Sequence, residues 1–306
     1  MKKIPLPLFT LILSLLVAAT CAAQPHTPLY AVSVFPTPVL NIPGFAAVFG
    51  GRDGKTLRLD KCGQIREMEF VALPGTPFHI EETFHQGNTF IYRVTTDDYP
   101  YPTTKGYFID SRFVKTTDDP PLPRPRSLPP REKVIGNLLA AQGSRYVWGG
   151  NCRAGIPQIL AFYPPAAGFP IVQTTADLWQ LRGVDCSGLL YEATDGFTPR
   201  NTSALVNYGA PVPIAGLDTD RIIRLLKPLD LLAWAGHVMI VIDGQRIIES
   251  QMDCHEKRDG VRVRPLREAL IEIRKKRVPL DDFTAATVRG VKGFVIRRWY
   301  TADGLK

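Results

Sequence analysis

The chain has 306 residues, of which 45% are hydrophobic and 22% are charged, a composition that is ordinary for globular proteins. These values exclude wholesale disorder, and the length suits one large domain or two modest ones. The formal net charge of +8 fits an anionic partner as well as it fits solubility alone, so charge does not select a function.

The first residues predict export. A short positive start, Met1-Lys2-Lys3, precedes an apolar stretch over residues 4–19, and small residues follow up to Ala23. This is the layout of a secretory signal peptide over residues 1–23, cleaved after Ala23. The apolar stretch is short for a membrane span. We expect a periplasmic or secreted protein with no integral membrane span in the mature chain. A lipoprotein lipidated at Cys21 is the weaker alternative.

Residues 24–118 read as a β domain. Short apolar or alternating runs recur there, separated by glycine-containing turn clusters, a pattern typical of a small barrel or sandwich. The runs cover residues 30–35, 67–73, 77–82, 89–95 and 106–114. The stretches at 73–78, 90–94 and 106–111 resemble a bacterial SH3-type (SH3b) domain. That resemblance implies a small all-β, SH3-like barrel.

A proline-rich segment follows at residues 119–131. It contains Pro120-Pro121-Leu122-Pro123-Arg124-Pro125 and ends with Pro129-Pro130. Proline fixes φ and removes a backbone donor, so this composition is unsuited to a helix or a central strand. We expect an extended and fairly stiff linker between two domains.

Residues 132–306 show mixed periodicity. Apolar residues at helical spacing predict one helix over residues 131–142, and a turn entering a second helix is expected over 183–194. Apolar, β-branched runs at 231–242 and 246–250 flank a hairpin signal, and residues 293–300 read as a final strand. Helices beside an antiparallel sheet predict an α+β domain.

The motif Val184-Asp185-Cys186-Ser187-Gly188 is the first candidate for chemistry. A cysteine in the first turn of a helix faces unpaired backbone N–H groups and the positive end of the helix dipole, and both stabilise a thiolate over a thiol. Because the thiolate is the reactive form, Cys186 is a candidate nucleophile. The alternative is a buried structural cysteine, the usual role of a lone Cys.

A histidine opens an apolar strand about fifty residues later, in Gly236-His237-Val238. An imidazole is costly to bury without a partner, and a lone histidine is more often a satisfied core residue. An imidazole beside a cysteine, however, can accept the thiol proton and pass it to a leaving amine. His237 is therefore the candidate base.

Five motifs in this order resemble the NlpC/P60 peptidases, over nearly all of residues 132–300. They are Tyr146-Val147-Trp148-Gly149-Gly150, Asp185-Cys186-Ser187-Gly188-Leu189, Pro199-Arg200-Asn201-Thr202, Leu229-Asp230-Leu231 and Gly236-His237-Val238. The resemblance implies a papain-like α+β core in which Cys186 is the nucleophile and His237 the base. It also implies that Tyr146, Asp185 and Ser187 contact substrate. Tyr146 would lie beside the nucleophile, and Asp185 would help to hold a free amino end.

The third polar residue of the site depends on strand register. Family members usually carry His, Asn or Gln on the strand after the catalytic histidine, and the matching residue here is Glu249. A carboxylate could orient the imidazole and stabilise its cation. A two-residue turn at Asp243-Gly244 would place Glu249 on the opposite face from His237. A three-residue turn with a glycine bulge restores it to the same face and pairs His237 with Gln251, the alternative third residue.

Three further features complete the sequence reading. The segment between Gly150 and Asp185 is longer than expected for the family and rich in proline, so we interpret it as a loop over or beside the cleft. The cysteine spacings match no zinc pattern, and a Cys152–Cys254 disulfide is conceivable in an oxidising compartment. The basic run at residues 274–277 reads as solvated surface rather than as a nucleic-acid site.

These patterns lead to one functional hypothesis and two alternatives. The expected activity is hydrolysis of peptidoglycan stem peptides at the γ-D-glutamyl–diamino acid bond, through a thioester acyl-enzyme and without a metal or organic cofactor. The expected partner is peptidoglycan or a muropeptide, and not nucleic acid. The first alternative is a catalytically inactive wall-binding protein. The second keeps the thiol chemistry but cleaves the sugar–peptide amide or transfers the acyl group.

Overall fold

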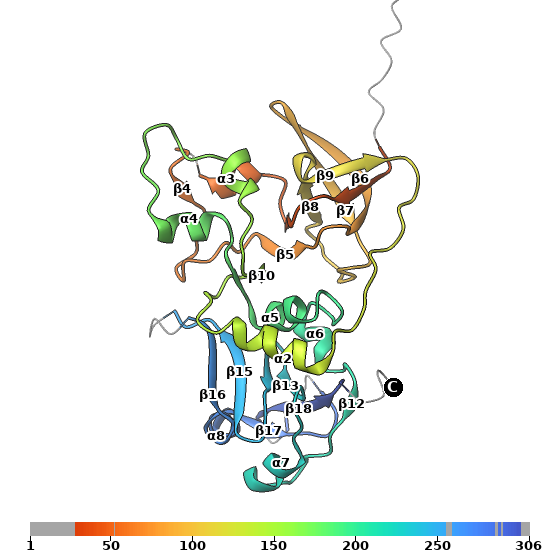
Figure 1. Ribbon diagram of the computed structural model, residues 1–306, viewed down its shortest axis with the longest axis vertical. Coiled ribbons are helices and arrows are strands. Elements are labelled where there is room, and N and C mark those ends of the chain that lie inside the picture. Colours follow the sequence, from red (N-terminus) through yellow and green to blue (C-terminus); the bar gives the residue numbers. More distant parts are fainter. Residues whose placement is uncertain (1–27, 52, 255–258, 285–286, 289, 301–306) are drawn as a thin grey trace, which may run out of the picture.

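The computed structural model of the protein describes residues 28–51, 53–254, 259–284, 287–288 and 290–300. The expected signal peptide, residues 1–23, lies outside these ranges. Within them, none of the helices combines the length and the apolar character that a bilayer crossing needs. Two antiparallel sheets occupy opposite ends of the molecule, and helix α5 (Cys186–Ala193) lies between them (Figure 1).

The N-terminal region forms a seven-stranded antiparallel sheet in the order β5-β2-β8-β7-β6-β1-β9. Its elements are β1 (Tyr30–Ser33), β2 (Thr37–Leu40), β5 (Met68–Ala72), β6 (Pro77–Gln86), β7 (Thr89–Thr95), β8 (Tyr107–Asp110), the 3₁₀ turn η1 (Ser111–Phe113) and β9 (Val114–Thr117). The sheet does not close in the described residues, so the expected SH3-like barrel is not confirmed. The outer edge of β5 is occupied instead, because the side-chain amide of Asn151 pairs with both the N–H and the carbonyl of Val71 at 3.0 and 2.9 Å.

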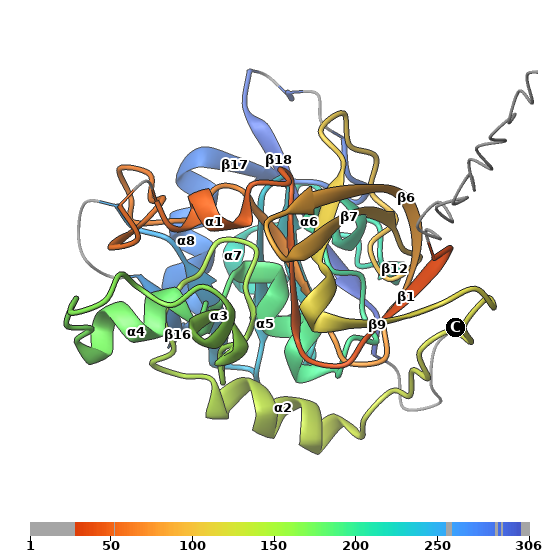
Figure 2. The same ribbon diagram turned by 90° about the horizontal axis from the view of Figure 1, so that it is seen from above.

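Two inserted segments pack against each other beside this sheet (Figures 1 and 2). One follows β2 and contains α1 (Phe45–Val48), β3 (Phe49–Gly50) and β4 (Thr56–Leu57). The other is the proline-rich stretch after Gly150, with β10 (Asn151–Cys152), α3 (Gln158–Phe162), α4 (Gln173–Trp179) and β11 (Gly183–Val184). The two share one apolar core, in which Phe45, Ile159 and Trp179 are fully buried.

The expectation of a loop over or beside the cleft is therefore wrong for the middle of this second segment. Its four prolines suggested irregular structure, yet they fall outside α3 and α4, and Pro157 occupies the N-cap of α3. Apolar residues between the prolines bury against the N-terminal region rather than against the site described below.

The C-terminal region forms the second sheet, in the order β12-β18-β13-β14-β15-β16, with β17 parallel to β18. Its strands are β12 (Ala210–Pro211), β13 (Leu231–Trp234), β14 (His237–Val241), β15 (Arg246–Gln251), β16 (Gly260–Pro265), β17 (Arg277–Pro279) and β18 (Lys292–Arg298). The helices are α2 (Arg131–Ala140), α5, α6 (Thr202–Leu205), α7 (Thr219–Leu225) and α8 (Leu266–Lys276). The predicted mixture of helices and an antiparallel sheet is present.

Alternation along the strands divides this sheet into two apolar faces. In β13, Leu231 and Ala233 pack with α2 and α5, whereas Leu232 packs with α7 and α8. In β14, Val238 and Ile240 face α5 in the same way, and Met239 faces α8. Both faces of the sheet are thus covered, which holds β14 and β15 firmly beneath the end of α5.

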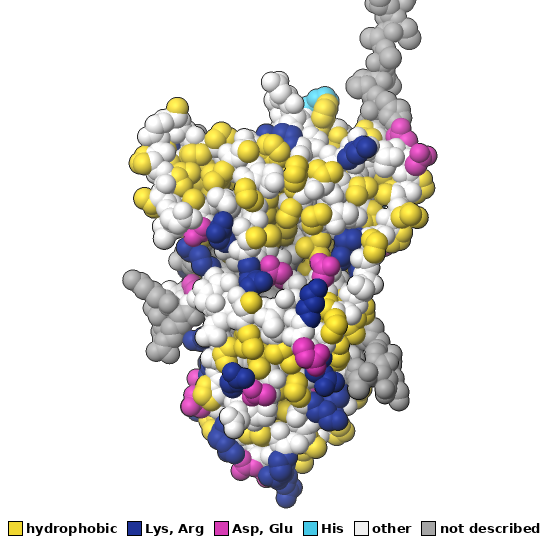
Figure 3. Space-filling view, in the orientation of Figure 1, with side chains coloured by type: hydrophobic (Ala, Val, Ile, Leu, Met, Phe, Trp, Pro, Cys, Tyr) yellow, Lys and Arg dark blue, Asp and Glu magenta, His cyan; other side chains and the backbone are white. Residues whose placement is uncertain are grey.

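The proline-rich segment crosses from one region to the other. Arg124 donates to the carboxylate of Asp98 at 3.1 Å and to the carbonyls of Asp195 and Gly196, which follow α5. This buried guanidinium joins the two regions without regular structure in the segment itself. In one view of the surface, hydrophobic side chains gather over the N-terminal region, and most charged side chains lie nearer the middle and the C-terminal region (Figure 3).

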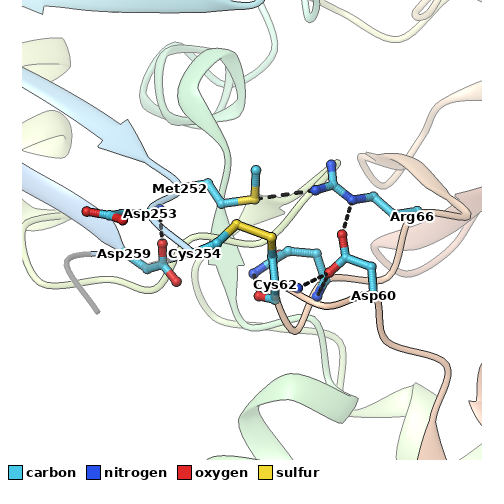
Figure 4. Close-up of a disulfide and its surroundings, with 8 residues drawn as sticks. Asp60, Cys62, Arg66, Met252, Asp253, Cys254 and Asp259 are labelled. Carbon is cyan, nitrogen blue, oxygen red and sulfur yellow. Dashed lines mark hydrogen bonds and ion pairs between the residues drawn. A yellow bond between two sulfur atoms is a disulfide. The ribbon is translucent and has the colours of Figure 1, made fainter. Parts of the chain in front are cut away.

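A disulfide joins Cys62 of the N-terminal region to Cys254, three residues after β15 (Figure 4). The Cys152–Cys254 pairing that the sequence left conceivable is therefore not formed. Cys152 is free and hydrogen-bonds the carbonyl of Gly155, because β10 and β11 hold it within the inserted segment. Sequence spacing alone does not determine connectivity, since the two partners are 192 residues apart.

Candidate active site

Helix α5 begins at Cys186, and Asp185 is its N-cap. The Asp185 carboxylate accepts from the N–H of Gly188 at 2.6 Å and from the Ser187 hydroxyl at 3.2 Å, which satisfies donors of the first turn. A side chain at Gly188 would place its Cβ only 2.0 Å from the carbonyl oxygen of Gly150, so only glycine fits there. The sequence Asp-Cys-Ser-Gly thus fixes the helix start and leaves the Cys186 side chain at the positive end of the helix.

His237 reaches this helix end from a tight hairpin. Trp234 pairs with His237 across a two-residue turn that ends with Gly236 at a φ of 93°, a conformation that favours glycine. The Cys186 sulfur lies 3.9 Å from the carbonyl oxygen of Gly236. The Cys186 sulfur and the His237 imidazole therefore lie close together, where the start of α5 meets the start of β14.

The protonation of His237 follows from its neighbours. Burial alone would lower the pKa of His237, but hydrogen bonds and charge from Cys186 and Glu249 outweigh it and raise that pKa to about 9. The imidazole is therefore cationic at neutral pH. An imidazolium between a sulfur and a carboxylate stabilises a thiolate and holds a proton ready for a leaving amine.

Glu249 contacts His237 directly. The imidazole Nε2 donates to the Glu249 carboxylate at 2.8 Å, which leaves Nδ1 for the thiol. Asp243 accepts from the N–H groups of Gln245 and Arg246, closing a three-residue turn. Ile240 consequently pairs with Ile248, the register that puts Glu249 on the face of His237.

Gln251, the alternative third residue, is engaged elsewhere. Its side-chain oxygen accepts from the Arg262 guanidinium on the next strand, and no hydrogen bond joins Gln251 to His237 within the described residues. The carboxylate is thus the group that lies against the imidazole, and the Gln251 amide is bound by Arg262 of β16.

Glu249 is fully buried and depends on its two basic neighbours, His237 and Arg264, to remain ionised. Burial opposes the charge, but the hydrogen bond from His237 and then that from Arg264, at 2.8 Å, hold the pKa of Glu249 below its usual value. Arg264 also donates to Glu272 on α8. The site therefore continues from Cys186 through His237, Glu249 and Arg264 to the surface carboxylate of Glu272.

Arg200 organises the other side of Cys186, and the sequence reading gave it no role. Its Nη1 and Nη2 donate to the two oxygens of Asp185 at 3.0 and 2.7 Å. Its remaining N–H bonds reach Ser187, Asn151 and the carbonyl of Gly150, so all five donors of the guanidinium are used. Three motifs that are far apart in the sequence meet on this one buried side chain. The signal was present as an arginine between Pro199 and Asn201, but its partners are tertiary.

Tyr146, Asp185 and Ser187 lie around Cys186. Burial, followed by the charges of Asp185 and Cys186, raises the pKa of Tyr146, which places its ring beside both groups. The Asp185 carboxylate and the Ser187 hydroxyl already bind Arg200. Their contact with substrate remains a prediction.

A pocket of about 730 Å³ opens next to the imidazole. This volume suits a small peptide or a drug-sized ligand. Its walls include Tyr146, Trp148, Trp234, His237, Glu249 and Met252. The Trp234 ring packs on the His237 ring with centroids 5.1 Å apart, so one wall of the pocket also supports the candidate base.

The N-terminal region supports the opposite wall (Figure 4). The Arg66 guanidinium lies over the Trp148 ring at 4.3 Å and donates to the Met252 sulfur at 3.6 Å. Asp60 accepts from Arg66, and the disulfide holds the same loop to the chain after Met252. The N-terminal region therefore shapes the pocket through two of its wall residues. In the described residues, no cluster of three or more His, Cys, Asp or Glu side chains could hold a metal ion.

Comparisons with known proteins give two negative results and one set of structural neighbours. No family model matches the chain, and no curated protein matches it. An NlpC/P60 family protein from Bacillus cereus shares 14% identity over 89% of this chain, at a TM-score of 0.31. This chain spans 63% of the length of that protein.

Two further neighbours carry the same family description. RipD from Mycobacterium tuberculosis, described as a non-catalytic NlpC/p60 domain protein adapted to peptidoglycan binding, shares 17% identity over 55% of this chain and 95% of its own, with a TM-score of 0.30. NlpC2 from Trichomonas vaginalis shares 13% identity over 90% of this chain and 74% of its own, with a TM-score of 0.30. The neighbours are thus NlpC/P60 proteins, at low overall similarity.

Proposed function

We propose that this protein is an exported cysteine peptidase that hydrolyses peptidoglycan stem peptides at the γ-D-glutamyl–diamino acid bond. One observation carries the proposal. Cys186, at the first position of a capped helix, lies next to the imidazolium of His237, whose Nε2 is bound to the buried carboxylate of Glu249. A structural cysteine needs neither a helix N-terminus nor a charged histidine beside it.

The same arrangement supports each step of the reaction. The Cys186 thiolate attacks the carbonyl carbon, and the backbone N–H of Cys186 is suited to receive the oxyanion. His237 gives its proton to the departing amine, which leaves a thioester on Cys186. His237, then neutral, takes a proton from water, and the hydroxide released hydrolyses the thioester. Glu249 keeps the ring oriented throughout, and Arg264 keeps Glu249 ionised.

The substrate class rests on the resemblance of the five motifs and on the shape of the site. The pocket has aromatic walls and charged residues along one side, which suits an amphipathic peptide carrying ionised groups. Tyr146, Asp185 and Ser187 are proposed to bind the substrate on the acyl side of Cys186.

Replacing Cys186 with alanine tests the mechanism. Purified peptidoglycan is incubated with the wild-type protein and with the Cys186→Ala variant, and the released stem-peptide fragments are identified by mass spectrometry. We expect the variant to retain its fold but to release fragments at less than about 10⁻³ of the wild-type rate, because it has no nucleophile. Fragments that end in a free γ-D-glutamyl carboxyl group identify the γ-D-glutamyl–diamino acid bond as the one that is cleaved.

The matched control is Cys152→Ala. Cys152 is the other free cysteine among the described residues, and burial raises the pKa of its thiol to about 11. This control should cleave at the wild-type rate. Equal activity of wild type and Cys186→Ala would reject the thiol mechanism. An unchanged peptidoglycan profile with tight retention of the protein would favour the wall-binding alternative, and fragments cut at the sugar–peptide junction would favour the amidase.

A further inference from the structure

Three cations at the end of the pocket have no carboxylate partner in the part of the chain that the structure describes. They are Lys275 and Lys276, the last residues of α8, and Arg277, the first residue of β17. All three line the same pocket as His237. No ion pair joins any of them to an acidic side chain within the described residues, whereas their neighbour Arg264 is shared between Glu249 and Glu272.

Arg277 is held close to the chemistry. Its guanidinium lies over the Trp234 ring at 4.8 Å, and the other neighbour of that ring is the imidazole of His237 at 5.1 Å. In the described part of the chain, Arg277 donates a hydrogen bond only to the carbonyl of Gly293, at 3.4 Å. Burial lowers the pKa of Arg277, which marks a partly desolvated cation without an anion.

The side of the substrate that meets these cations follows from the reaction. His237 must touch the departing amine, because it protonates that nitrogen. The pocket extends from His237 toward Arg277, so it takes the leaving half of the peptide. The separation from imidazole to guanidinium is roughly 10 Å at most, which the side-chain carboxyl of a single diamino acid residue can span.

We propose that Arg277, assisted by Lys275 and Lys276, forms a subsite for a free carboxylate on the leaving half of the substrate. This inference rests on the proposed peptidase function and specifies the substrate further. A planar guanidinium stacked on an aromatic ring is preorganised to bind a carboxylate with two hydrogen bonds, and the two lysines add charge on the solvent side. A diamino acid leaving group with ionised carboxyl groups fits this description.

The experiment compares two synthetic peptides that differ only in this charge. One is L-Ala–γ-D-Glu–diaminopimelic acid, and the other carries carboxamides in place of the carboxyl groups of the diaminopimelic residue. For the wild-type protein we expect kcat/KM to be about tenfold or more higher for the acid, because hydrogen bonds to charged groups are the strong ones. In Arg277→Gln this ratio should fall to about one, with the amide peptide cleaved almost as before.

Two further variants separate binding from folding. Lys275→Gln/Lys276→Gln alters only exposed side chains and should lose part of the preference. Arg274→Gln, from the same basic run, is the matched control, because Arg274 bonds the carbonyl of Leu217 and does not line the pocket. It should keep the wild-type ratio. An unchanged ratio in both pocket variants, or an equal loss on both peptides in Arg277→Gln, overturns the subsite.

Failure of the proposed function gives a different result. If wild type cleaves neither peptide, the peptidase proposal fails, and calorimetric binding of the same two peptides then tests the subsite alone. Tighter binding of the acid that Arg277→Gln abolishes supports the subsite. Equal binding of the acid and the amide overturns it.

Discussion

Two buried carboxylates flank Cys186, and they are held in different ways. Asp185 is bound by the first turn of α5 and by both terminal nitrogens of Arg200, a permanent cation. Glu249 is bound by Arg264 and by His237, a group that can lose its charge. The cation of the first pair, Arg200, keeps its charge because, against the opposing effect of burial, Asp185 raises its pKa further, whereas the cation of the second pair, His237, can lose its charge.

This difference separates positioning from chemistry. The Asp185–Arg200 cluster draws three chain segments together and fixes where the sulfur lies, but its cation is a guanidinium, which cannot pass a proton near neutral pH. The His237–Glu249 pair can, because its imidazole titrates at about 9. Changes on the Asp185 side should therefore reduce stability, and changes on the Glu249 side should reduce turnover.

The largest expected effect comes from replacing Arg200 with methionine. The side chain is only 3% exposed, so its loss leaves the buried Asp185 carboxylate without its cation and removes one of the donors to the Asn151 side-chain oxygen. Breaking a buried ion pair from one side costs about 3–5 kcal/mol. The free energy of unfolding of the Arg200→Met variant, measured by urea denaturation, should be lower than that of the wild type by this amount.

The control for Arg200 is an ion pair to a residue of α5, the helix that Asp185 caps. Arg153 pairs with Glu192, with side chains 32% and 23% exposed, so Arg153→Met should cost no more than about 1 kcal/mol. Similar losses in both variants would mean that the Asp185 cluster has no special structural role.

The Asp185–Arg200 cluster also shows which parts of the site could be predicted from the sequence. The start of α5 was predictable, because the aspartate at its N-cap is a local signal. The meeting of Arg200 with Gly150, Asn151 and Asp185 was not, since it joins separate segments. The same reason explains why the partner of Cys254 was missed.

The disulfide gives the second prediction, on the side of Glu249. Strand β15 carries Glu249 and leads directly into Cys254, whereas the Asp185 cluster has no such tether. Replacing Cys62 and Cys254 by serine should lower the free energy of unfolding by about 2–4 kcal/mol, because it releases a cross-link over 192 residues.

Loss of the Cys62–Cys254 cross-link should also lower the peptidase activity. Without the cross-link, Arg66 no longer holds Met252 and Trp148 as firmly, so kcat/KM should fall severalfold while Arg200 and α5 are undisturbed. The Cys152→Ser variant, which removes a free thiol, is the control and should match wild type. Unchanged stability after loss of both disulfide cysteines would show that the two regions need no tether.

The register of β14 with β15 determines how much of the remaining site could be predicted from the sequence. Glu249 and Gln251 lie on the same face of β15, and the three-residue turn that Asp243 closes brings both to the face of His237. The turn therefore selects the face but not the residue. Gln251 is bound by Arg262, and Glu249 is the residue that bonds the imidazole.

The smallest predicted effect, and the most specific, is that of Glu249→Gln. The amide keeps the size of the side chain but removes its charge, so kcat/KM should fall about 10²-fold, near the lower end of the contribution of a positioned acid–base group. Gln251→Ala is the matched control and should change kcat/KM by no more than a few-fold, because Gln251 bonds Arg262 instead. A larger loss in Gln251→Ala than in Glu249→Gln would assign the third role to Gln251.

The pH profile separates orientation from charge at this position. The pKa of His237 is raised above its ordinary 6.5 to about 9, so the ion pair stabilises the fold fully below about pH 6.5 and is lost as pH rises through 9. Activity that depends on the imidazolium should decline over the same upper range. Without the Glu249 charge the imidazolium keeps only the sulfur as its anionic partner, so the alkaline limb of the Glu249→Gln variant should move to lower pH. An alkaline limb that stays in place would mean that Glu249 only orients the ring.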